Sequence, residues 1–227
     1  MAPRQKHGFT LVELLVTVTV LALLAGLLLP ALARAKKKCR AAVCRNNLHQ
    51  VGLSLNLFLA DHDAFFPRAV GYDLPESPDV EAGISRYLTG QSKVVECPDG
   101  EELVTPAAIF HARYGYNAWG SGPGFHESML GLGGAGALSP QRMAESAIVS
   151  PGEMVAFGDT AFDFGVPMGP ARVNRGAEPP HAHHFGGANM IFCDAHVEFA
   201  LVSRWTAQTD MARKRWNNDN LPHPETW

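Results

Sequence analysis

The sequence predicts an α+β protein in which one long N-terminal α-helix packs on a small antiparallel β-sheet domain with long loops. The N-terminal part indicates the helix, because an apolar stretch long enough to cross a bilayer runs into a segment with helical spacing of apolar residues. The second half indicates the sheet, since short strand-like runs alternate with segments rich in glycine and proline. The 227 residues, 46% hydrophobic and 18% charged, suit one modest domain plus the apolar stretch.

The N-terminus divides sharply into a polar leader and an apolar segment. Residues 1–8 are polar and basic, and the chain turns apolar at Phe9. No charged residue occurs in the 20 positions 14–33, which is about one bilayer span for a helix. A secretory signal peptide has a shorter apolar region that ends in small residues before a cleavage site. We therefore expect a leader at 1–8 and a membrane-spanning helix over 9–33, with the Gly8–Phe9 junction between them.

One acidic residue, Glu13, interrupts the apolar segment. A carboxylate at the centre of a bilayer costs at least about 2.5 kcal/mol, so its position needs a reason. One reason is that a residue near the end of a span reaches the headgroups. Another requires cleavage after Gly8, which would leave a free amine on Phe9, one helical turn from Glu13. In a packed assembly the carboxylate would instead pair with a neighbour's amine, and the two buried charges would neutralise each other.

The segment from Gly8 to Val16, GFTLVELLV, resembles the processing site of type IV prepilins and type II secretion pseudopilins. The resemblance rests on Gly before the junction, Phe after it and Glu at the fifth position of the mature chain. It implies a pilin-like α+β fold, cleavage between Gly8 and Phe9 by prepilin peptidase, N-methylation of Phe9 and a role for Glu13 in assembly. It also implies that Pro30 kinks the helix.

On this resemblance the expected function is structural rather than enzymatic. The chain would be a pseudopilin, a filament subunit of a type II secretion-like system assembled at the inner membrane, with no catalytic residues and no cofactor. Its partners would be prepilin peptidase, other copies of itself, minor pseudopilins, the secretion or pilus assembly machinery and membrane lipid. A type IV pilus subunit and a membrane-tethered periplasmic binding module that does not polymerise stay open as alternatives, and a tethered metallohydrolase is the third hypothesis.

The charge distribution bears on partners and on orientation. The formal net charge of −3 gives no case for nucleic-acid binding. Six cations follow the span and are suited to phospholipid headgroups or acidic neighbours: Arg34, Lys36, Lys37, Lys38, Arg40 and Arg45. They outnumber Arg4 and Lys6 of the leader, so the positive-inside rule alone would place the C-terminal side in the cytoplasm. The pilin resemblance implies the opposite, a single-pass inner-membrane protein with an exported C-terminal domain, and we expect that orientation.

Beyond the span, residues 34–62 keep a helical pattern. Apolar residues recur at offsets 0, 3, 7, 10 and 11 and form an amphipathic stripe that would pack on a globular domain: Leu48, Val51, Leu55, Phe58 and Leu59. Gly52 is a weak point in this helix, at roughly 1 kcal/mol relative to alanine. The alternative is a helix that is broken at Pro30 and again near Lys36.

Residues 63–227 form the expected exported α+β domain, with a C-terminal hairpin and tail. The predicted strands cover 112–116, 153–157, 188–192 and 197–202, and the last two make a β-hairpin around a turn at 193–196. The glycine-rich segment from Ser121 to Gly136 is interpreted as a surface loop. The tail from Met211 to Trp227 combines prolines with two tryptophans, which indicates a strap across its own domain or a contact to the next subunit or a secretion partner.

The predicted hairpin carries a second resemblance. His184 is followed by nine residues and Asp194, which is similar to the H-x9-DG motif of a C-terminal processing-associated domain in type IV pilin-like proteins. Residues 44–48, 97–98 and 114–117 also resemble that group. Ala195 stands where the motif has glycine, so the turn costs about 1 kcal/mol or adopts another type. We interpret the motif as structural, with Asp194 ordering the turn and His184 fixing the approach of the hairpin.

Metal binding has weak support from the sequence. The candidate ligands are His181, His183, His184, Asp194 and His196, but no H-E-x-x-H pattern fixes their geometry. Asp61 and Asp63 raise the possibility of calcium, although no D-x-D-x-D-G loop is present.

The cysteines leave several arrangements open. None of Cys39, Cys44, Cys97 and Cys193 forms a CxxC pair. Cys39 and Cys44 would lie roughly 140° apart around a continuous helix and should not pair. A disulfide from Cys44 to Cys97 or to Cys193 is open, and so is a set of small buried thiols.

Overall fold

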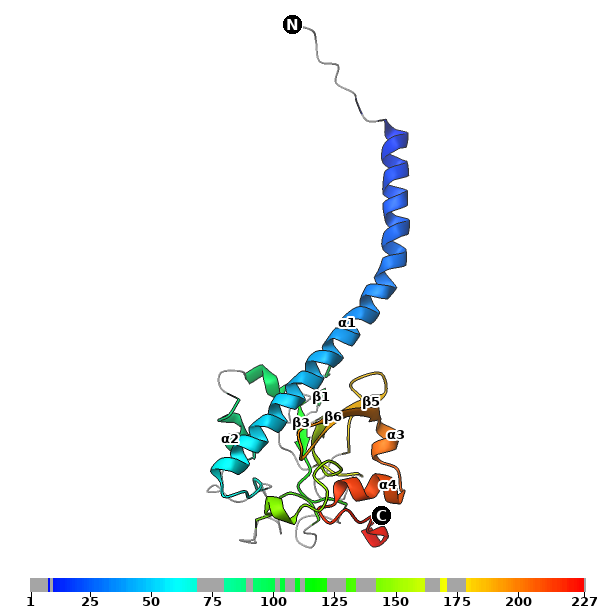
Figure 1. The fold of residues 1–227 in the computed structure, drawn as a ribbon. Helices are drawn as coiled ribbons and strands as arrows, with labels where there is room; N and C mark the ends of the chain where they lie inside the picture. The colour runs from blue at the N-terminus through cyan, green and yellow to red at the C-terminus, as the bar shows by residue number, and fades with distance from the viewer. Residues whose placement is uncertain are drawn as a thin grey trace. The chain divides into compact units, whose positions relative to one another are not determined.

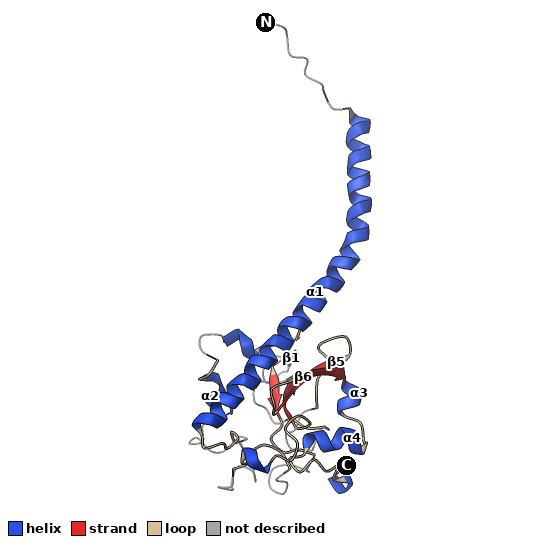
Figure 2. Ribbon diagram, in the orientation of Figure 1, coloured by secondary structure: helices blue, strands red, loops and turns tan. Residues whose placement is uncertain are grey.

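The computed structural model describes residues 8, 10–68, 80–88, 92–100, 103–104, 109–110, 113–121, 130–133, 142–161, 168–170 and 179–226. The chain forms two compact units, Met1–Arg40 and Ala41–Trp227, and one long helix, α1 (Leu11–Asp61), runs from the first into the second (Figure 1). Within the second unit lie the other described helices (Figure 2): α2 (Val80–Ser85), η1 (Ser92–Val95), η2 (Glu145–Ala147), α3 (Val202–Trp205), α4 (Asp210–Arg213), η3 (Lys214–Trp216) and η4 (Pro224–Thr226).

The helix α1 is uninterrupted over 51 residues. It passes through Pro30 and through the basic segment at Lys36, so the alternative of a helix broken at these points is wrong. Its end is determined by the backbone, since Asp63 and Ala64 have φ of 54° and 59°, and the Ala64 N–H bonds to the Leu59 carbonyl at 2.9 Å. Residues in this left-handed region terminate helices. The predicted end of the helical pattern agrees closely with this position.

The main sheet has four antiparallel strands in the order β3-β4-β5-β6. Their bounds are Tyr114–Tyr116 for β3, Val155–Asp159 for β4, Gly187–Phe192 for β5 and Val197–Leu201 for β6. All four predicted strands are confirmed with small shifts at their ends, and β5 pairs with β6 as the predicted hairpin. A separate two-stranded sheet, β1 (Leu103–Val104) with β2 (Ile109–Phe110), is missed by the sequence pattern.

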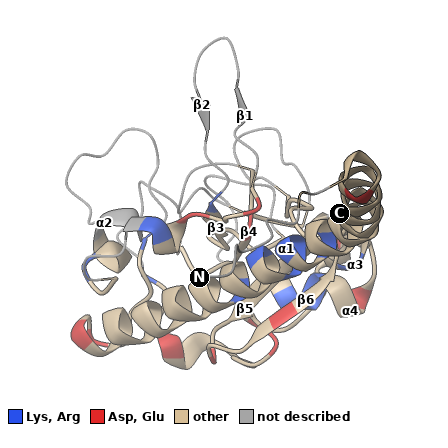
Figure 3. Ribbon diagram, turned by 90° about the horizontal axis from the view of Figure 1, so that it is seen from above, with Lys and Arg blue, Asp and Glu red and all other residues tan. Residues whose placement is uncertain are grey.

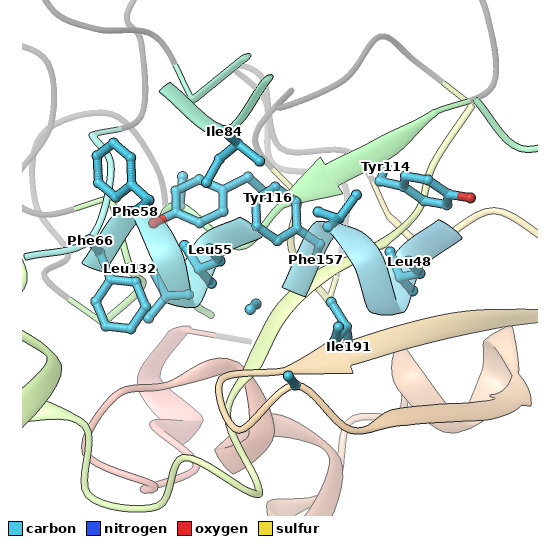
Figure 4. Packing of buried hydrophobic residues seen from close by; sticks show 14 of the residues in the cluster. Leu48, Leu55, Phe58, Phe66, Ile84, Tyr114, Tyr116, Leu132, Phe157 and Ile191 are labelled. Atoms are coloured by element: carbon cyan, nitrogen blue, oxygen red, sulfur yellow. The ribbon is translucent and has the colours of Figure 1, made fainter. Parts of the chain in front are cut away.

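The amphipathic stripe of α1 packs on one face of the main sheet. The five predicted residues are buried: Leu48, Val51, Leu55, Phe58 and Leu59. They share a core cluster with Tyr116, Phe157 and Ile191 (Figure 4). A Cβ at Gly52 would collide with the Ile191 side chain, so the glycine lets α1 approach β5 closely. The residue that weakens the isolated helix is therefore required by its packing.

The opposite face of the sheet carries a second core. Side chains alternate along β5, so that Ile191 joins the α1 core whereas Met190 and Phe192 face the other way. Trp205 and Trp216, which are at most 1% exposed, complete this second cluster. Both faces of β5 are consequently buried, which explains its near-continuous apolar sequence.

Hydrogen bonds fasten the tail to this face. The Trp205 indole N–H donates to the Ala188 carbonyl at 3.0 Å, and the Trp216 indole N–H donates to the Trp205 carbonyl at 3.1 Å. The Thr226 hydroxyl donates to the Ser121 hydroxyl at 3.1 Å. The described part of the tail is therefore a strap across its own domain, which is the first of its two predicted roles.

The glycine-rich segment is only partly a surface loop. Leu132 is fully buried in the α1 core, and its N–H donates to the Asn117 carbonyl at 2.9 Å. The surface-loop prediction is therefore wrong for Ser121 and for residues 131–133, all of which are buried. Residues 122–129 and 134–136 of the predicted loop lie outside the described residues.

The substitution Gly131→Ala is expected to lower the free energy of unfolding by about 1–3 kcal/mol. A Cβ at Gly131 would overlap the backbone of Ala118 and Trp119, which has no side-chain freedom to give way. Urea unfolding of the full-length protein in detergent measures the change. Gly152→Ala is the matched control, because Gly152 is exposed and its added Cβ would meet the mobile end of Asp194. Equal unfolding midpoints for the two variants would contradict the close packing at Gly131.

Candidate functional site

The first part of α1 presents apolar side chains to its surroundings. The apolar stretch of this helix is not buried within the protein, and the helix is long and apolar enough to cross a membrane. Leu21, Leu24 and Leu27, for example, are 64%, 53% and 76% exposed. Exposure of this kind marks a surface for lipid or for other apolar helices. The Thr17 hydroxyl donates to the Leu14 carbonyl at 2.8 Å, so it brings no unsatisfied polar group into that surface.

The helix begins with a capping box formed by Thr10 and Glu13. The Thr10 backbone N–H donates to Glu13 Oε2 at 2.9 Å, and the Glu13 N–H donates to the Thr10 hydroxyl at 3.2 Å. The Thr10 hydroxyl also donates to Glu13 Oε2 at 2.8 Å. Sequence reasoning missed this arrangement, although Thr-x-x-Glu before an apolar run is its usual signature. Because Phe9 lies outside the described residues, the pairing of Glu13 with an N-terminal amine stays a prediction.

The basic segment, residues 34–45 of α1, follows the apolar stretch directly. All six of its cations are solvent-exposed, and basic residues colour this part of the helix in Figure 3. One guanidinium nitrogen of Arg45 donates to the Val197 carbonyl at 3.3 Å, so the last of the six cations is tied to β6. The exposed side chains of Arg34 and of the three lysines at 36–38 are suited to headgroups or to acidic surfaces.

The structure divides the five weak metal candidates among three environments. His181 and His183 approach each other, with 3.2 Å between their Nδ1 atoms, and His183 Nε2 lies 2.8 Å from the Thr160 carbonyl. Asp194 and His196 form a second group in the β5–β6 turn, where Asp194 Oδ1 lies 2.6 Å from His196 Nδ1. The His184 side chain is directed into the protein interior. These residues therefore do not converge on one ion.

In the turn after β5, Ala195 stands where the H-x9-DG motif has glycine. Ala195 has a φ of 69°, in the left-handed region that costs an L-residue about 1–2 kcal/mol. Asp194 Oδ1 accepts a hydrogen bond from the His196 backbone N–H at 3.1 Å within this turn. At the other end of β5, His184 and Gly187 exchange two backbone hydrogen bonds of 3.2 and 2.8 Å.

His184 belongs to a buried cluster with Cys44, Cys97 and Asp159. His184 Nε2 lies 3.3 Å from Cys97 Sγ and 3.8 Å from Asp159 Oδ2. Cys44 Sγ lies 3.2 Å from Asp159 Oδ1. The cysteines are free thiols here, so the expectation of small buried thiols holds for Cys44 and Cys97. Sequence reasoning missed Asp159, because a lone acid at the end of a strand carries no motif.

Close packing perturbs the protonation of this cluster. A hydrogen bond with Cys44 lowers the pKa of the Cys97 thiol to about 6, whereas the same contact and burial raise the pKa of Cys44. Burial raises the pKa of Asp159. Burial lowers the pKa of His184, but its hydrogen bond to Cys97 and the charge of Asp159 outweigh this and raise it. The two thiols therefore titrate as a pair rather than independently.

The calcium candidates at the end of α1 have other roles. Asp61 accepts a hydrogen bond from the Tyr87 hydroxyl at 2.8 Å, and Asp63 contributes the left-handed backbone that ends the helix. Among the residues that the structure describes, they do not gather with other acids into a group of possible ligands.

The comparisons with known proteins match the N-terminal part of the chain. Residues 3–29 match the family model of the prokaryotic N-terminal methylation motif. Over 65 residues, 29% of this chain, the sequence is 29% identical to the type II secretion system core protein G of Pseudomonas aeruginosa. That alignment covers 46% of the relative, so the chain spans about half the length of the curated relative it matches. No solved structure matches.

The long N-terminal helix and the small antiparallel sheet on which it packs match an α+β pilin-like fold, and the N-terminal motif is of the prepilin type. The similarity of the chain's N-terminal part to the secretion core protein supports a pseudopilin-like protein. Both comparisons point to a structural subunit. The H-x9-DG resemblance of the C-terminal domain stays a prediction.

Proposed function

We propose that the chain is a filament subunit of a type II secretion-like system, and that the apolar part of α1 holds it in the bacterial inner membrane before assembly. This proposal rests mainly on one observation: the apolar stretch of α1 is exposed and is part of an N-terminal methylation motif. Exposed apolar side chains also continue beyond the span, at Val43, Leu53 and Leu57, which are 50%, 48% and 53% exposed. A helix that packs against other copies of itself needs such a face after it leaves the bilayer.

Processing is the second part of the proposal. Prepilin peptidase would cleave between Gly8 and Phe9, and the new amine of Phe9 would be methylated. The motif match over residues 3–29 supports this position, and Gly8 is exposed to solvent. In the assembled filament Glu13 would leave its capping box and pair with the amine of a neighbouring copy, because an unpaired carboxylate is costly in an apolar bundle.

The topology is the third part. The domain that begins after the basic segment would lie outside the cytoplasm, in agreement with prepilin-type processing on the cytoplasmic side. The basic segment would then lie at the outer headgroups, against the positive-inside rule, and would favour anionic lipid or acidic neighbours there. Its exposed cations support such contacts.

Assembly is tested by expressing the full-length chain in cells that contain prepilin peptidase and a pseudopilus assembly system. The expected result is a sheared, sedimenting filament that contains the chain. Gly8→Leu is the control, because an added Cβ at Gly8 would meet nothing within 4 Å, so a defect would reflect processing rather than packing. If the chain stays as dispersed membrane protein while the resident major pseudopilin forms filaments, the filament proposal fails.

A further inference from the structure

The buried cluster of Cys44, Cys97, Asp159 and His184 has the composition of a zinc site. Two thiols, one imidazole and one carboxylate are all ligands that zinc accepts. One ligand atom from each residue lies within 4.8 Å of the other three. The four residues come from separate segments: α1, the residues after η1, the end of β4 and the residues before β5. Among the residues that the structure describes, no other group of possible metal ligands comes together in this way.

The spacing of the donors fits tetrahedral coordination. Zinc binds sulfur at about 2.3 Å and nitrogen or oxygen at about 2.0 Å, so neighbouring ligand atoms of a tetrahedron lie about 3.3–3.8 Å apart. Cys44 Sγ lies 3.2 Å from Asp159 Oδ1, and Cys97 Sγ lies 3.3 Å from His184 Nε2. All four ligand atoms lie within 4.8 Å of one another, so small shifts of the side chains would bring them to these separations.

The groups around the donors hold them in ligand orientations. Asp159 Oδ2 accepts hydrogen bonds from the backbone and side-chain N–H groups of Asn189, at 2.8 and 3.0 Å, which leaves Oδ1 toward Cys44. His184 directs Nε2 to the cluster, while its buried Nδ1 lies 3.4 Å from Asp99 Oδ2 without an aligned hydrogen bond. A carboxylate behind the second nitrogen of a histidine is the usual outer shell of a zinc ligand.

We propose that Cys44, Cys97, Asp159 and His184 bind a structural zinc ion that joins α1 to the sheet. The side chains are at most 5% exposed, which suits a closed structural site rather than a catalytic site with an open position. Binding would release the two thiol protons to solvent, and the two positive charges of the ion would offset two of the three negative charges of the thiolates and the carboxylate. The competing arrangement is a disulfide between Cys44 and Cys97, which is chemically favoured in an exported domain.

The test uses the full-length protein, extracted in detergent without chelator. Elemental mass spectrometry should find stoichiometric zinc in the wild type, which Cys97→Ala loses. Cys193→Ala is the matched control, since Cys193 is a thiol outside the cluster, and should keep its zinc. If Cys97→Ala fails to fold, Co²⁺ exchange into the wild type tests metal binding instead. Four-coordinate Co²⁺ with thiolate ligands should give intense visible absorption.

Two results would overturn the proposal. The first is a wild-type protein that, after exposure to zinc and dialysis, retains no metal and gives no tetrahedral Co²⁺ spectrum. The second is a non-reducing peptide map of protein taken directly from cells in which the Cys44 and Cys97 peptides are joined by a disulfide. Filament assembly is measured separately, so either result leaves the proposed function standing.

Discussion

Glu13→Ala is expected to remove the chain from filaments and leave its C-terminal domain folded. If Glu13 neutralises the amine of a neighbouring copy, its loss leaves that amine buried without a partner, which costs about 3–5 kcal/mol. At about 1.4 kcal/mol for each factor of ten, incorporation should fall roughly a hundred-fold or more. The fraction of the chain in sheared filaments, compared with total protein, measures this. Thermal unfolding of the domain should be unchanged.

Glu13→Gln is the control that separates charge from helix capping. The capping box with Thr10 uses a side-chain oxygen that glutamine also provides, so this variant keeps the local hydrogen bonds and loses only the charge. If charge pairing is the cause, Glu13→Gln and Glu13→Ala should be equally defective in filament incorporation. Normal incorporation of Glu13→Gln would show that the residue acts through the start of the helix, and the pairing idea would be abandoned.

Trp216→Ala is expected to lower the free energy of unfolding by about 3–5 kcal/mol. Trp216 is fully buried in the second core, its indole N–H donates to the Trp205 carbonyl at 3.1 Å, and its own carbonyl accepts from the Asn117 amide at 3.0 Å. Removal of the ring opens a large cavity beneath the sheet and loosens the strap. Tryptophan fluorescence during denaturant unfolding of the full-length protein in detergent gives the midpoint.

The matched control for this variant is Met211→Ala, on the same strap. Met211 is 69% exposed, so truncation should change stability by no more than about 0.5 kcal/mol. If Trp216→Ala unfolds at the same midpoint as Met211→Ala, the strap does not stabilise the domain, and the Trp216 ring is not part of the second core.

Regular periodicity explains which parts of the fold are predictable from sequence. The stripe from Leu48 to Leu59 follows a helical period, and the runs around Ile191 and Val197 flank a polar turn, so both elements follow from local pattern. Leu132 is different, because one apolar residue among glycines has no period. Its burial depends on the Asn117 backbone, to which it hydrogen-bonds, and the local sequence does not encode that contact.

The buried cluster shows the same limit at the level of a site. His184 is conspicuous in the sequence, yet the sequence groups it with nearby histidines rather than with its actual neighbours. Cys97 is 87 positions away from His184, and Cys44 is 115 positions away from Asp159. Only the packing of α1 against the sheet brings these side chains together. A candidate site assembled from four segments therefore needs the tertiary structure.

The central claim, that the chain is a prepilin-type subunit, is tested most directly by mass spectrometry of its N-terminal peptide. The protein is extracted from the membranes of a host with an active prepilin peptidase, with Gly8→Leu as the uncleaved reference. We expect a peptide that begins at Phe9 and carries one added methyl group. A wild-type peptide that still begins at Met1 or Ala2 in that host would contradict it.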